Sequence, residues 1–463
     1  MQQIFTSDRM AAFFRSIGVA KLSNDWSFKM TANTLENHWM PFTANRSFKK
    51  QPRLLVRAEG MYYWDHNGKK ILDGAAGIHC VNAGHGRPEI RNAIAKMLQD
   101  VDYVPHFSVG HPISFELAQK IARITPGDLN YLFFVNSGSE AVDTAMKMAL
   151  AYHYARGEPQ RVRFVGRQRA YHGVNFGGLS VSGMVKNREA FGVGLPGTVH
   201  IRHTFCEEQR FSNGQPEMGA NFAEDLQRVV ETFGAKSIAA VLVEPVAGST
   251  GILVSPRGYL ERIREICTEN GILMIADEVG TGFGRTGAAF ASERIGVVPD
   301  LMTMAKAITN GTVPMGAVAA SENIYKTITD SAPDGATELF HGYTFSAHPV
   351  ACAAGVAAMD IYENEQLFDR AMAISGYFLD SLRALRDLPA VIDVRGFGLM
   401  AGVELVKGEH VGQRGHAALR DLFDAGLLIR APGDTLALTP PLTIEKPHVD
   451  EMCEKLRGVI KRI

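Results

Sequence analysis

The sequence predicts an α/β protein with a large domain, built on a mostly parallel sheet, and a smaller α+β domain. A chain of 463 residues is longer than one hydrophobic core normally organises, which suggests roughly two or three domains. Short apolar runs alternate with longer helical patterns through the middle of the chain, as in a parallel sheet flanked by helices. The last part of the chain loses that alternation, and we expect the smaller domain there.

Several apolar runs are predicted to be strands buried on both faces, because they carry no polar side. They are residues 131–135 (YLFFV), 163–166 (RFVG), 238–245 (IAAVLVEP), 271–279 (GILMIADEV) and 301–305 (LMTMA). Between them, residues 140–157 and 259–271 have a helical pattern, and each ends in the glycine that commonly follows a helix.

The domain boundaries follow from these changes in pattern. Residues 1–75 are expected to form an N-terminal arm and part of the small domain, residues 76–350 the large domain, and residues 351–463 the C-terminal small domain. The apolar run at residues 10–22 is interrupted by Arg15 and is expected to be an ordered arm or helix. A transit peptide is the weaker alternative, because Asp8 and Asp25 are acidic.

Charge and cysteine content restrict the partners and the compartment. Lys and Arg number 48 against 49 Asp and Glu, so no summed field draws nucleic acid or an anionic membrane to the whole surface. We expect a small-molecule partner or a second copy of the chain. The five cysteines lie far apart without CxxC spacing, which favours a reducing cytoplasm and no zinc site. We find no run of about 18 apolar residues, the length that would span a membrane.

Ligands gather at the carboxyl ends of parallel strands, so the residues that follow each predicted strand are the first candidates for a site. Ser137, Gly138 and Ser139 lie between a predicted strand and a helix. Small residues there expose backbone amides at a helix N-terminus, which suits a phosphate group. The alternative is that Ser139 only caps the helix.

Two ionisable side chains follow neighbouring predicted strands. Asp277 ends the most apolar strand, where a desolvated carboxylate needs a cationic partner such as a protonated ring nitrogen, although it could instead cap the following loop. Lys306 is the single ionisable residue of residues 301–318. Apolar surroundings favour the neutral amine that a nucleophile needs, whereas an ordinary lysine would extend its amine to water.

An aromatic side chain completes this set. Tyr171 and His172 lie in a glycine-rich turn after another predicted strand, although a buried Tyr more often packs a loop. A phosphate cradle, a carboxylate, a ring to stack on and a lone amine are together what pyridoxal 5′-phosphate (PLP) requires.

Other patterns resemble different sites. Residues 192–197 and 282–287 match the dinucleotide-binding glycine spacing, but neither both follows a strand and opens a helix, and both are expected to be loops. Residues His38, His106, His348 and Glu338 lack metal-ligand spacing, so no metal is predicted.

With these residues identified, the chain resembles the class III, fold-type I PLP-dependent aminotransferases over nearly its whole length. The motifs are NSGSEAVDTAMKMA (136–149), YHG (171–173), VEPVAG (243–248), ADEVGTGFGRTG (276–287), DLMTMAKAITNG (300–311), PMGAV (314–318) and HGYTFSAHPVACAAG (341–355). Residues 38–48 and 80–87 are most similar to the ω-amino acid:pyruvate, or β-alanine:pyruvate, branch. The resemblance implies a seven-stranded type of sheet, with the smaller domain built from both termini.

The resemblance also implies roles for the central residues. Lys306 would form a Schiff base with PLP and move the proton between the substrate carbon and the cofactor. Asp277 would keep the pyridine nitrogen protonated. Tyr171 and Val279 would lie on the two faces of the ring.

Phosphate binding would involve two subunits. Gly138 and Ser139 would bind the phosphate together with Thr344 of a second subunit, so the smallest active unit would be a homodimer, with a tetramer as a further option.

For the substrate, the resemblance assigns Arg430 to the carboxylate, and Glu244 could be its resting partner when the amine has none. His79 stands where the ω-branch usually has Trp, which suggests a bulkier or more polar substrate than β-alanine. Gly280 stands where a branched apolar residue is usual and could loosen packing beside the cofactor.

The predicted function is a cytosolic PLP-dependent aminotransferase, an ω-transaminase that passes the amino group of an ω-amino acid or related primary amine to pyruvate in a ping-pong cycle. A decarboxylase or aminomutase of the same fold is the first alternative. An NAD-dependent dehydrogenase using a glycine-rich loop, and a non-catalytic binding protein, are alternatives from other classes.

Overall fold

The computed structural model describes residues 35–192 and 194–463, so the predicted arm or helix at residues 10–22 lies outside the described residues. The chain divides into two compact units. The first comprises Met1–Arg57 with Tyr63–Lys69, and the second comprises Ala58–Tyr62 with Lys70–Ile463. All of the predicted site residues belong to the second unit. The predicted boundaries at residues 75 and 350 remain predictions.

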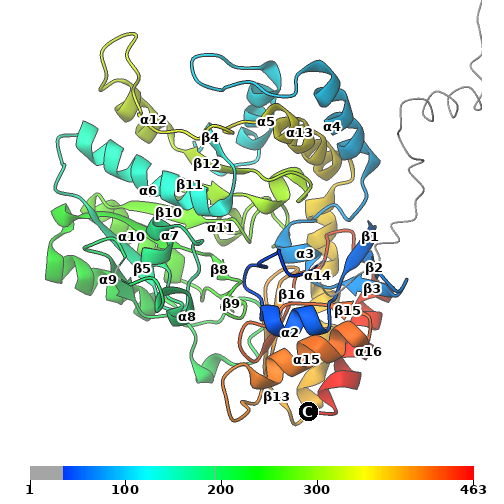
Figure 1. The fold of residues 1–463 in the computed structure, drawn as a ribbon. Coiled ribbons are helices and arrows are strands. Elements are labelled where there is room, and N and C mark those ends of the chain that lie inside the picture. Colours follow the sequence, from blue (N-terminus) through cyan, green and yellow to red (C-terminus); the bar gives the residue numbers. More distant parts are fainter. Residues whose placement is uncertain (1–34, 193) are drawn as a thin grey trace, which may run out of the picture. The chain divides into compact units, whose positions relative to one another are not determined.

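A seven-stranded sheet forms the centre of the second unit, as predicted (Figure 1). Its order is β4 (Tyr131–Val135), β12 (Gly316–Ala320), β11 (Leu301–Met304), β10 (Leu273–Asp277), β7 (Ile238–Val243), β5 (Arg163–Arg167) and β6 (Val199–Ile201). β12 is antiparallel to both of its neighbours, and the remaining pairs are parallel. The sheet is therefore mostly parallel, and its parallel strands end at one edge.

All of the predicted strands are confirmed: β4 has the predicted bounds, and the other four differ from their predicted bounds at one or both ends. β7 stops at Val243 because Pro245 has no amide proton for the ladder, and β10 stops at Asp277 because that carboxylate turns the chain. β12 and β6 were not predicted: β12 consists mainly of Ala and Gly, and β6 has only three residues. Such segments carry too little strand preference to stand out in a sequence.

Helices cover both faces of the sheet. Alternate residues of β7 point to opposite sides, so Leu242 packs with α6 (Gly138–Ala155) whereas Val243 packs with α10 (Tyr259–Asn270). The other helices of this region, shown with them in Figure 1, are α4 (Pro88–Asp100), α5 (Pro112–Ala122), α7 (Phe176–Val181), α8 (Val185–Arg188), α9 (Ala220–Phe233), α11 (Ala291–Ile295), α12 (Glu322–Thr329) and α13 (Pro349–Asn364). The two predicted helices are thus α6 and α10.

The C-terminal part adds a smaller α+β layer. Its antiparallel sheet has the order β13 (Val391–Gly396), β14 (Ala401–Leu405) and β16 (Thr435–Leu438), packed with α14 (Leu367–Arg383), α15 (Gln413–Asp424) and α16 (Lys446–Ile460). β3 (Lys70–Asp73) pairs in parallel with β15 (Leu427–Leu428), so both ends of the chain contribute, as the resemblance implied. Shorter elements are α2 (Asn45–Lys50), β1 (Leu55–Glu59), β2 (Tyr62–Asp65), α3 (Ala76–His79), β8 (Val246–Ala247) and β9 (Leu253–Val254). Among the described helices, none is long and apolar enough to cross a membrane.

Candidate active site

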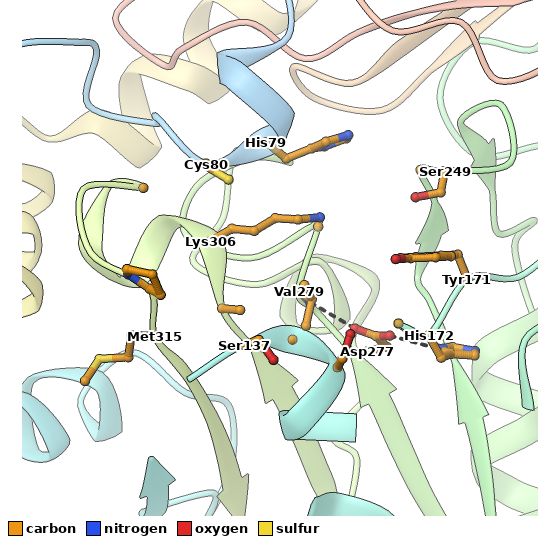
Figure 2. Close-up of a pocket in the computed structure, with 18 of the residues that line it drawn as sticks. His79, Cys80, Ser137, Tyr171, His172, Ser249, Asp277, Val279, Lys306 and Met315 are labelled. Atoms are coloured by element: carbon orange, nitrogen blue, oxygen red, sulfur yellow. Dashed lines mark hydrogen bonds and ion pairs between the residues drawn. The ribbon is translucent and has the colours of Figure 1, made fainter. Parts of the chain in front are cut away.

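A cavity of about 330 Å³ lies at the carboxyl ends of the parallel strands (Figure 2). β4, β5, β7, β10 and β11 each lead into a segment that lines it, as expected for an open α/β sheet. The predicted site residues that line the cavity are His79, Gly138, Ser139, Tyr171, Glu244, Asp277, Val279 and Lys306. Thr344 and Arg430 do not line it, and both are exposed.

The N-terminus of α6 forms one wall of the cavity. Ser137 is its cap, because the Ser137 hydroxyl accepts a hydrogen bond from the amide of Glu140 at 3.2 Å. The alternative that Ser139 caps this helix is therefore wrong: Ser139 lies in the first turn, and its hydroxyl accepts from the amide of Val174 at 3.0 Å. Gly138 permits close packing, since a Cβ there would lie 2.8 Å from Cγ1 of Val279. The first amides of a helix have no intrahelical partner and are available to an anion.

Asp277 is only 4% exposed, and three hydrogen bonds from the protein satisfy its buried carboxylate. Its Oδ2 lies 2.7 Å from Nδ1 of His172, and its Oδ1 accepts from Thr303 Oγ1 and from the Val279 amide, each at 3.1 Å. An ionised carboxylate only accepts, so Nδ1 of His172 carries the proton. The alternative that Asp277 caps the following loop is correct in part, because its carboxylate accepts the amide of Val279 in that loop. Asp277 also lines the cavity.

Sequence reasoning missed the supporting role of His172, which it named only as part of the turn with Tyr171, and it did not name Thr303 at all. Nε2 of His172 is buried and has no hydrogen-bond partner among the described residues. Thr303 is the one polar residue of β11 and lies beside Asp277 in the parallel register. A threonine inside an otherwise apolar strand was the available signal; for His172 the sequence offered only its place beside Tyr171.

Lys306 points into the cavity from the first residue of a short 3₁₀ turn (Lys306–Thr309) that follows β11 (Figure 2). Its backbone has a φ of +50°, a conformation that residues other than glycine seldom adopt. Its amine makes no hydrogen bond or ion pair with the described residues. A Cβ at Gly280 would lie 3.7 Å from Nζ of Lys306, so the departure at Gly280 leaves space beside the amine.

His79 lies at the opposite end of the cavity from Asp277 (Figure 2). Asp73, which is fully buried, accepts hydrogen bonds from the amides of Ala75 at 2.9 Å and Gly77 at 2.8 Å and so shapes the turn that carries His79. His79 itself has a φ of +60° and is 9% exposed. Burial, followed by the charges of nearby cations, lowers its pKa well below the usual range, so the ring is neutral. Its Nδ1 has no partner among the described residues.

Glu244 and Arg430 are not paired in the described structure. Oε1 of Glu244 accepts a hydrogen bond from the amide of Tyr171 at 2.9 Å. Burial raises the pKa of the Glu244 carboxyl, and the neighbouring Asp277 charge acts in the same direction. The Arg430 side chain makes no hydrogen bond or ion pair within the described part of the chain, and the predicted resting pair stays a prediction.

The remaining sequence predictions concern groups outside the cavity. The carbonyl oxygen of Thr344 accepts a hydrogen bond from the Tyr103 hydroxyl at 3.0 Å, and its predicted role in a second subunit remains a prediction. The two glycine-rich runs, of which residue 193 is not described, are loops as predicted and do not form a strand–turn–helix unit. Within residues 35–192 and 194–463, no three His, Cys, Asp or Glu side chains cluster as metal ligands would.

The described residues fit PLP in three respects. The free amides of α6 and the small residue Gly138 suit a phosphate, and the buried carboxylate of Asp277 suits a protonated ring nitrogen. The unpaired amine of Lys306 faces the same cavity. The three features come from different strands and meet only because the strands end at one edge.

Comparison with known proteins leads to the same family. The aminotransferase class-III family matches residues 43–460. The chain is 52% identical to the ω-aminotransferase of Caulobacter vibrioides, over 93% of this chain and 99% of that protein. It is 45% identical to the β-alanine–pyruvate aminotransferase of Pseudomonas aeruginosa, over 93% and 96% of the two chains. An amine transaminase from an uncultivated Pseudomonas species, solved in its PLP-bound form, has a TM-score of 0.85 and 32% identity, with 92% and 99% of the chains covered. The chain therefore belongs to the class III aminotransferases.

Proposed function

We propose that this enzyme uses PLP to move the amino group of an ω-amino acid or related primary amine to pyruvate, which yields alanine and an oxo product. One observation carries the proposal: Lys306, Asp277 and the N-terminus of α6 meet at a single cavity. The relative named as a β-alanine–pyruvate aminotransferase supports the choice of donor and acceptor. Donor and acceptor would use the same cavity in turn, as a ping-pong cycle requires.

The cavity offers a place for each part of the cofactor. Gly138 and Ser139 would hold the phosphate at the start of α6, and Asp277 would face the ring nitrogen. Tyr171 and Val279 would lie against the two faces of the ring. When bound, PLP withdraws electrons from the carbon that carries the amino group and so weakens the bonds to that carbon.

The chain's own residues would handle the protons. Lys306 is the amine at the cavity that would take a proton from the substrate carbon and return it, a role worth about 10²- to 10⁴-fold in rate. Asp277, fixed by three donors, would hold the ring nitrogen and favour its protonated form. His172 donates to that carboxylate and would fix its orientation.

Substrate recognition would fall to His79, Arg430 and Glu244. The guanidinium of Arg430, which has no partner among the described residues, would bind a substrate carboxylate through two parallel hydrogen bonds. Glu244 would pair with Arg430 when the amine has no carboxylate. A neutral imidazole at His79 is smaller and more polar than an indole, so the cavity would accept bulkier or more polar donors than β-alanine.

The active unit would be a cytosolic homodimer, with a tetramer as a further option. Thr344 is exposed and outside the cavity of its own chain, which is compatible with a role in the site of a second copy. Two measurements on the PLP-loaded protein test this. In sedimentation a Thr344→Ala variant should remain dimeric, and in equilibrium dialysis it should retain PLP less well than wild type. A wholly monomeric active enzyme would contradict the shared site.

A donor screen tests the activity. Protein loaded with PLP should form alanine from pyruvate with β-alanine or another primary amine, whereas Lys306→Ala should not. Lys186→Ala, on a surface lysine whose side chain is 88% exposed, is the matched control and should keep full activity. Release of carbon dioxide without alanine would favour the decarboxylase alternative. Quenching of nicotinamide fluorescence, in a protein without visible colour, would favour the dehydrogenase.

A further inference from the structure

The turn that carries Lys306 is held in an unfavourable backbone conformation. Lys306 has a φ of +50° and Asn310, at the end of the same turn, has a φ of +51°. The carbonyl of Lys306 accepts the amide of Gly311 at 3.1 Å, which closes the turn. A side chain at positive φ costs energy, so such a turn persists only where its surroundings hold it.

The side chain of Asn310 ties this turn to another segment. Its Oδ1 accepts a hydrogen bond from the amide of Ala83 at 2.8 Å, and its Nδ2 donates to the carbonyl of Gly84 at 2.9 Å. Asn310 is 5% exposed, so both bonds are shielded from water. A Cβ at Gly311 would lie 2.9 Å from Cβ of Cys80, which shows how closely the turn packs on residues 80–84.

Residues 80–84 are themselves anchored by buried hydrogen bonds. Asn82 is fully buried; its Nδ2 donates to the carbonyl of Phe283 at 2.7 Å, and its backbone carbonyl accepts the amide of Leu442 at 2.8 Å. Oδ1 of Asn82 accepts from Arg285, another fully buried residue, which also donates to the carbonyl of Pro440. The segment is thus a fixed support for Asn310.

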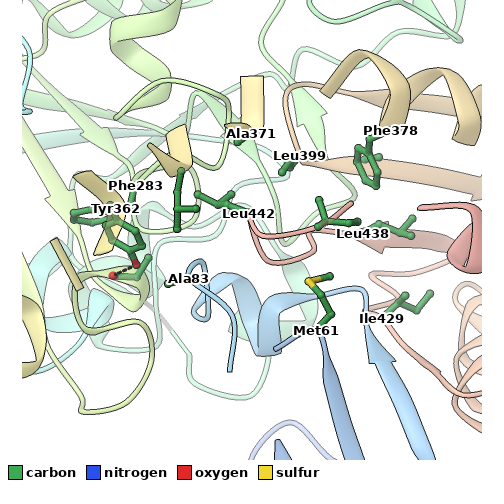
Figure 3. Close-up of a cluster of buried hydrophobic side chains, with 14 of the residues drawn as sticks. Met61, Ala83, Phe283, Tyr362, Ala371, Phe378, Leu399, Ile429, Leu438 and Leu442 are labelled. Carbon is green, nitrogen blue, oxygen red and sulfur yellow. Dashed lines mark hydrogen bonds between the residues drawn. The ribbon is translucent and has the colours of Figure 1, made fainter. Parts of the chain in front are cut away.

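The other side of the turn has its own support. The hydroxyl of Tyr362 donates to the carbonyl of Ala307 at 2.7 Å, the bond drawn as a dashed line in Figure 3. Asn310 and Tyr362 therefore hold the residues that follow Lys306 through two separate sets of hydrogen bonds. Residues 80–84 follow directly after His79 in the chain. His79 and Cys80 both line the cavity, so this support lies beside the site.

We propose that Asn310 is a positioning residue that clamps the Lys306 turn onto residues 83 and 84 and so directs the Lys306 amine at the cavity. The inference rests on the proposed function, because the amine matters only if Lys306 carries the reaction. Without the carboxamide, the turn would relax toward negative φ and the amine would move relative to the bound substrate. A misplacement of about 1 Å can cost about 10²-fold in rate.

Two variants separate the clamp from the backbone conformation. Asn310→Gly accepts a positive φ but has no carboxamide, and Asn310→Asp keeps the acceptor for Ala83 but loses the donor to Gly84. The matched control is Asn323→Ala, which removes an exposed asparagine whose Nδ2 donates to the Tyr152 hydroxyl at 3.0 Å. The wild type and the three variants are each measured as PLP-loaded enzyme. The measurements are kcat, the KM for the amine, the melting temperature, and the absorbance of the lysine-bound cofactor as a function of pH.

We expect both Asn310 variants to lower kcat by about 10- to 100-fold, with amine KM within about threefold of wild type. The pH midpoint of the absorbance change should also shift in both, while Asn323→Ala leaves kcat and midpoint unchanged. If the Asn310 variants lose only melting temperature and keep the wild-type kcat and midpoint, the residue is merely structural and the proposal is overturned. If wild type transfers no amino group from any donor, the proposed function fails, whereas the absorbance midpoints still decide the clamp.

Discussion

The carboxylate of Asp277 and the imidazole of His79, at opposite ends of the cavity, differ in how completely they are hydrogen-bonded. At the end where PLP would bind, the carboxylate of Asp277 has three hydrogen-bond donors, and Gly138 packs directly on Val279. At the other end, which we propose for the substrate, Nδ1 of His79 has no partner among the described residues. The carboxylate of Asp277 is therefore held in place by the fold, whereas the imidazole of His79 keeps bonding capacity that a substrate could use.

The contrast has a simple origin in the topology. Asp277 and the start of α6 follow strands of one sheet, so the ladder fixes their positions. His79 ends the short, kinked helix α3, and Arg430 forms an isolated bridge with Ala437, so neither residue lies on a strand of that sheet. We therefore expect changes at the first end to affect every substrate alike, and changes at the second end to affect some substrates only.

The largest effect should come from Asp277→Asn. The variant removes a buried charge opposite a cationic ring nitrogen, and breaking a buried pair of this kind costs about 3–5 kcal/mol, or about 10²- to 10³-fold or more in rate. kcat should fall for all donors alike. Asp300→Asn is the control, since Asp300 also accepts an amide, that of Met274 at 2.7 Å, but does not line the cavity. Equal losses in the two variants would show that the effect is one of stability.

A smaller loss should follow removal of the support behind Asp277. His172→Leu deletes a hydrogen bond to a charged group, which is worth about 1.5–3 kcal/mol, so PLP should dissociate about 10- to 100-fold more readily in equilibrium dialysis. His172→Asn can still offer a donor near the Nδ1 position and should recover part of that affinity. If Leu and Asn variants retain PLP as wild type does, His172 does not support the cofactor end.

Close packing at this end predicts a rescue. Gly138→Ala would place a Cβ 2.8 Å from Val279 Cγ1, and overpacking of this kind costs about 1–3 kcal/mol of unfolding free energy. The melting temperature and PLP retention should both fall. The double variant Gly138→Ala with Val279→Ala should restore the space and recover melting temperature; failure to do so would mean that the strain arises elsewhere.

The mildest effect should come from His79→Phe at the substrate end. PLP retention should stay unchanged, while kcat/KM for oxygen-bearing donors falls by about tenfold relative to a hydrocarbon amine of equal length, because one hydrogen bond is lost. His79→Trp, which fills the space, should disfavour bulky donors. An unchanged donor profile in both variants would contradict a role for His79 in selection.

The same variant has a stability signature. The folded pKa of His79 lies below its unfolded value, so its contribution to stability is present above about pH 6.5 and is lost as the pH falls toward the folded pKa. Each pH unit in that window removes up to about 1.4 kcal/mol. His79→Phe should therefore lose less melting temperature than wild type between pH 7.5 and pH 5.5, as measured by calorimetry.

Most of the cofactor end could be predicted from the sequence because its signals are local. Lys306 and Asp277 are conspicuous charges next to apolar strands, and strand alternation implies that they meet at one edge. Their supports could not be predicted, because the His172–Asp277 bond joins residues 105 positions apart. The same is true of Asn310 and Ala83, which are separated by 227 positions and meet only through packing of the folded chain.

The substrate end was predicted less completely for a related reason. The positive φ at His79 and the turn shaped by Asp73 belong to a short, kinked helix and the two residues before it. No periodic pattern marks them, so sequence alone suggests a position without an orientation. Ser249 also lines the cavity and was not predicted. A serine in a glycine-rich loop has no distinguishing local signal.

Reduction of the PLP-loaded protein with borohydride, followed by peptide mass spectrometry, tests the central claim most directly. The reduced cofactor should be attached to the peptide that carries Lys306, and the yellow colour should be lost as the attachment becomes permanent. Attachment to a peptide carrying any other lysine, or a protein that stays colourless after incubation with PLP, would contradict the account.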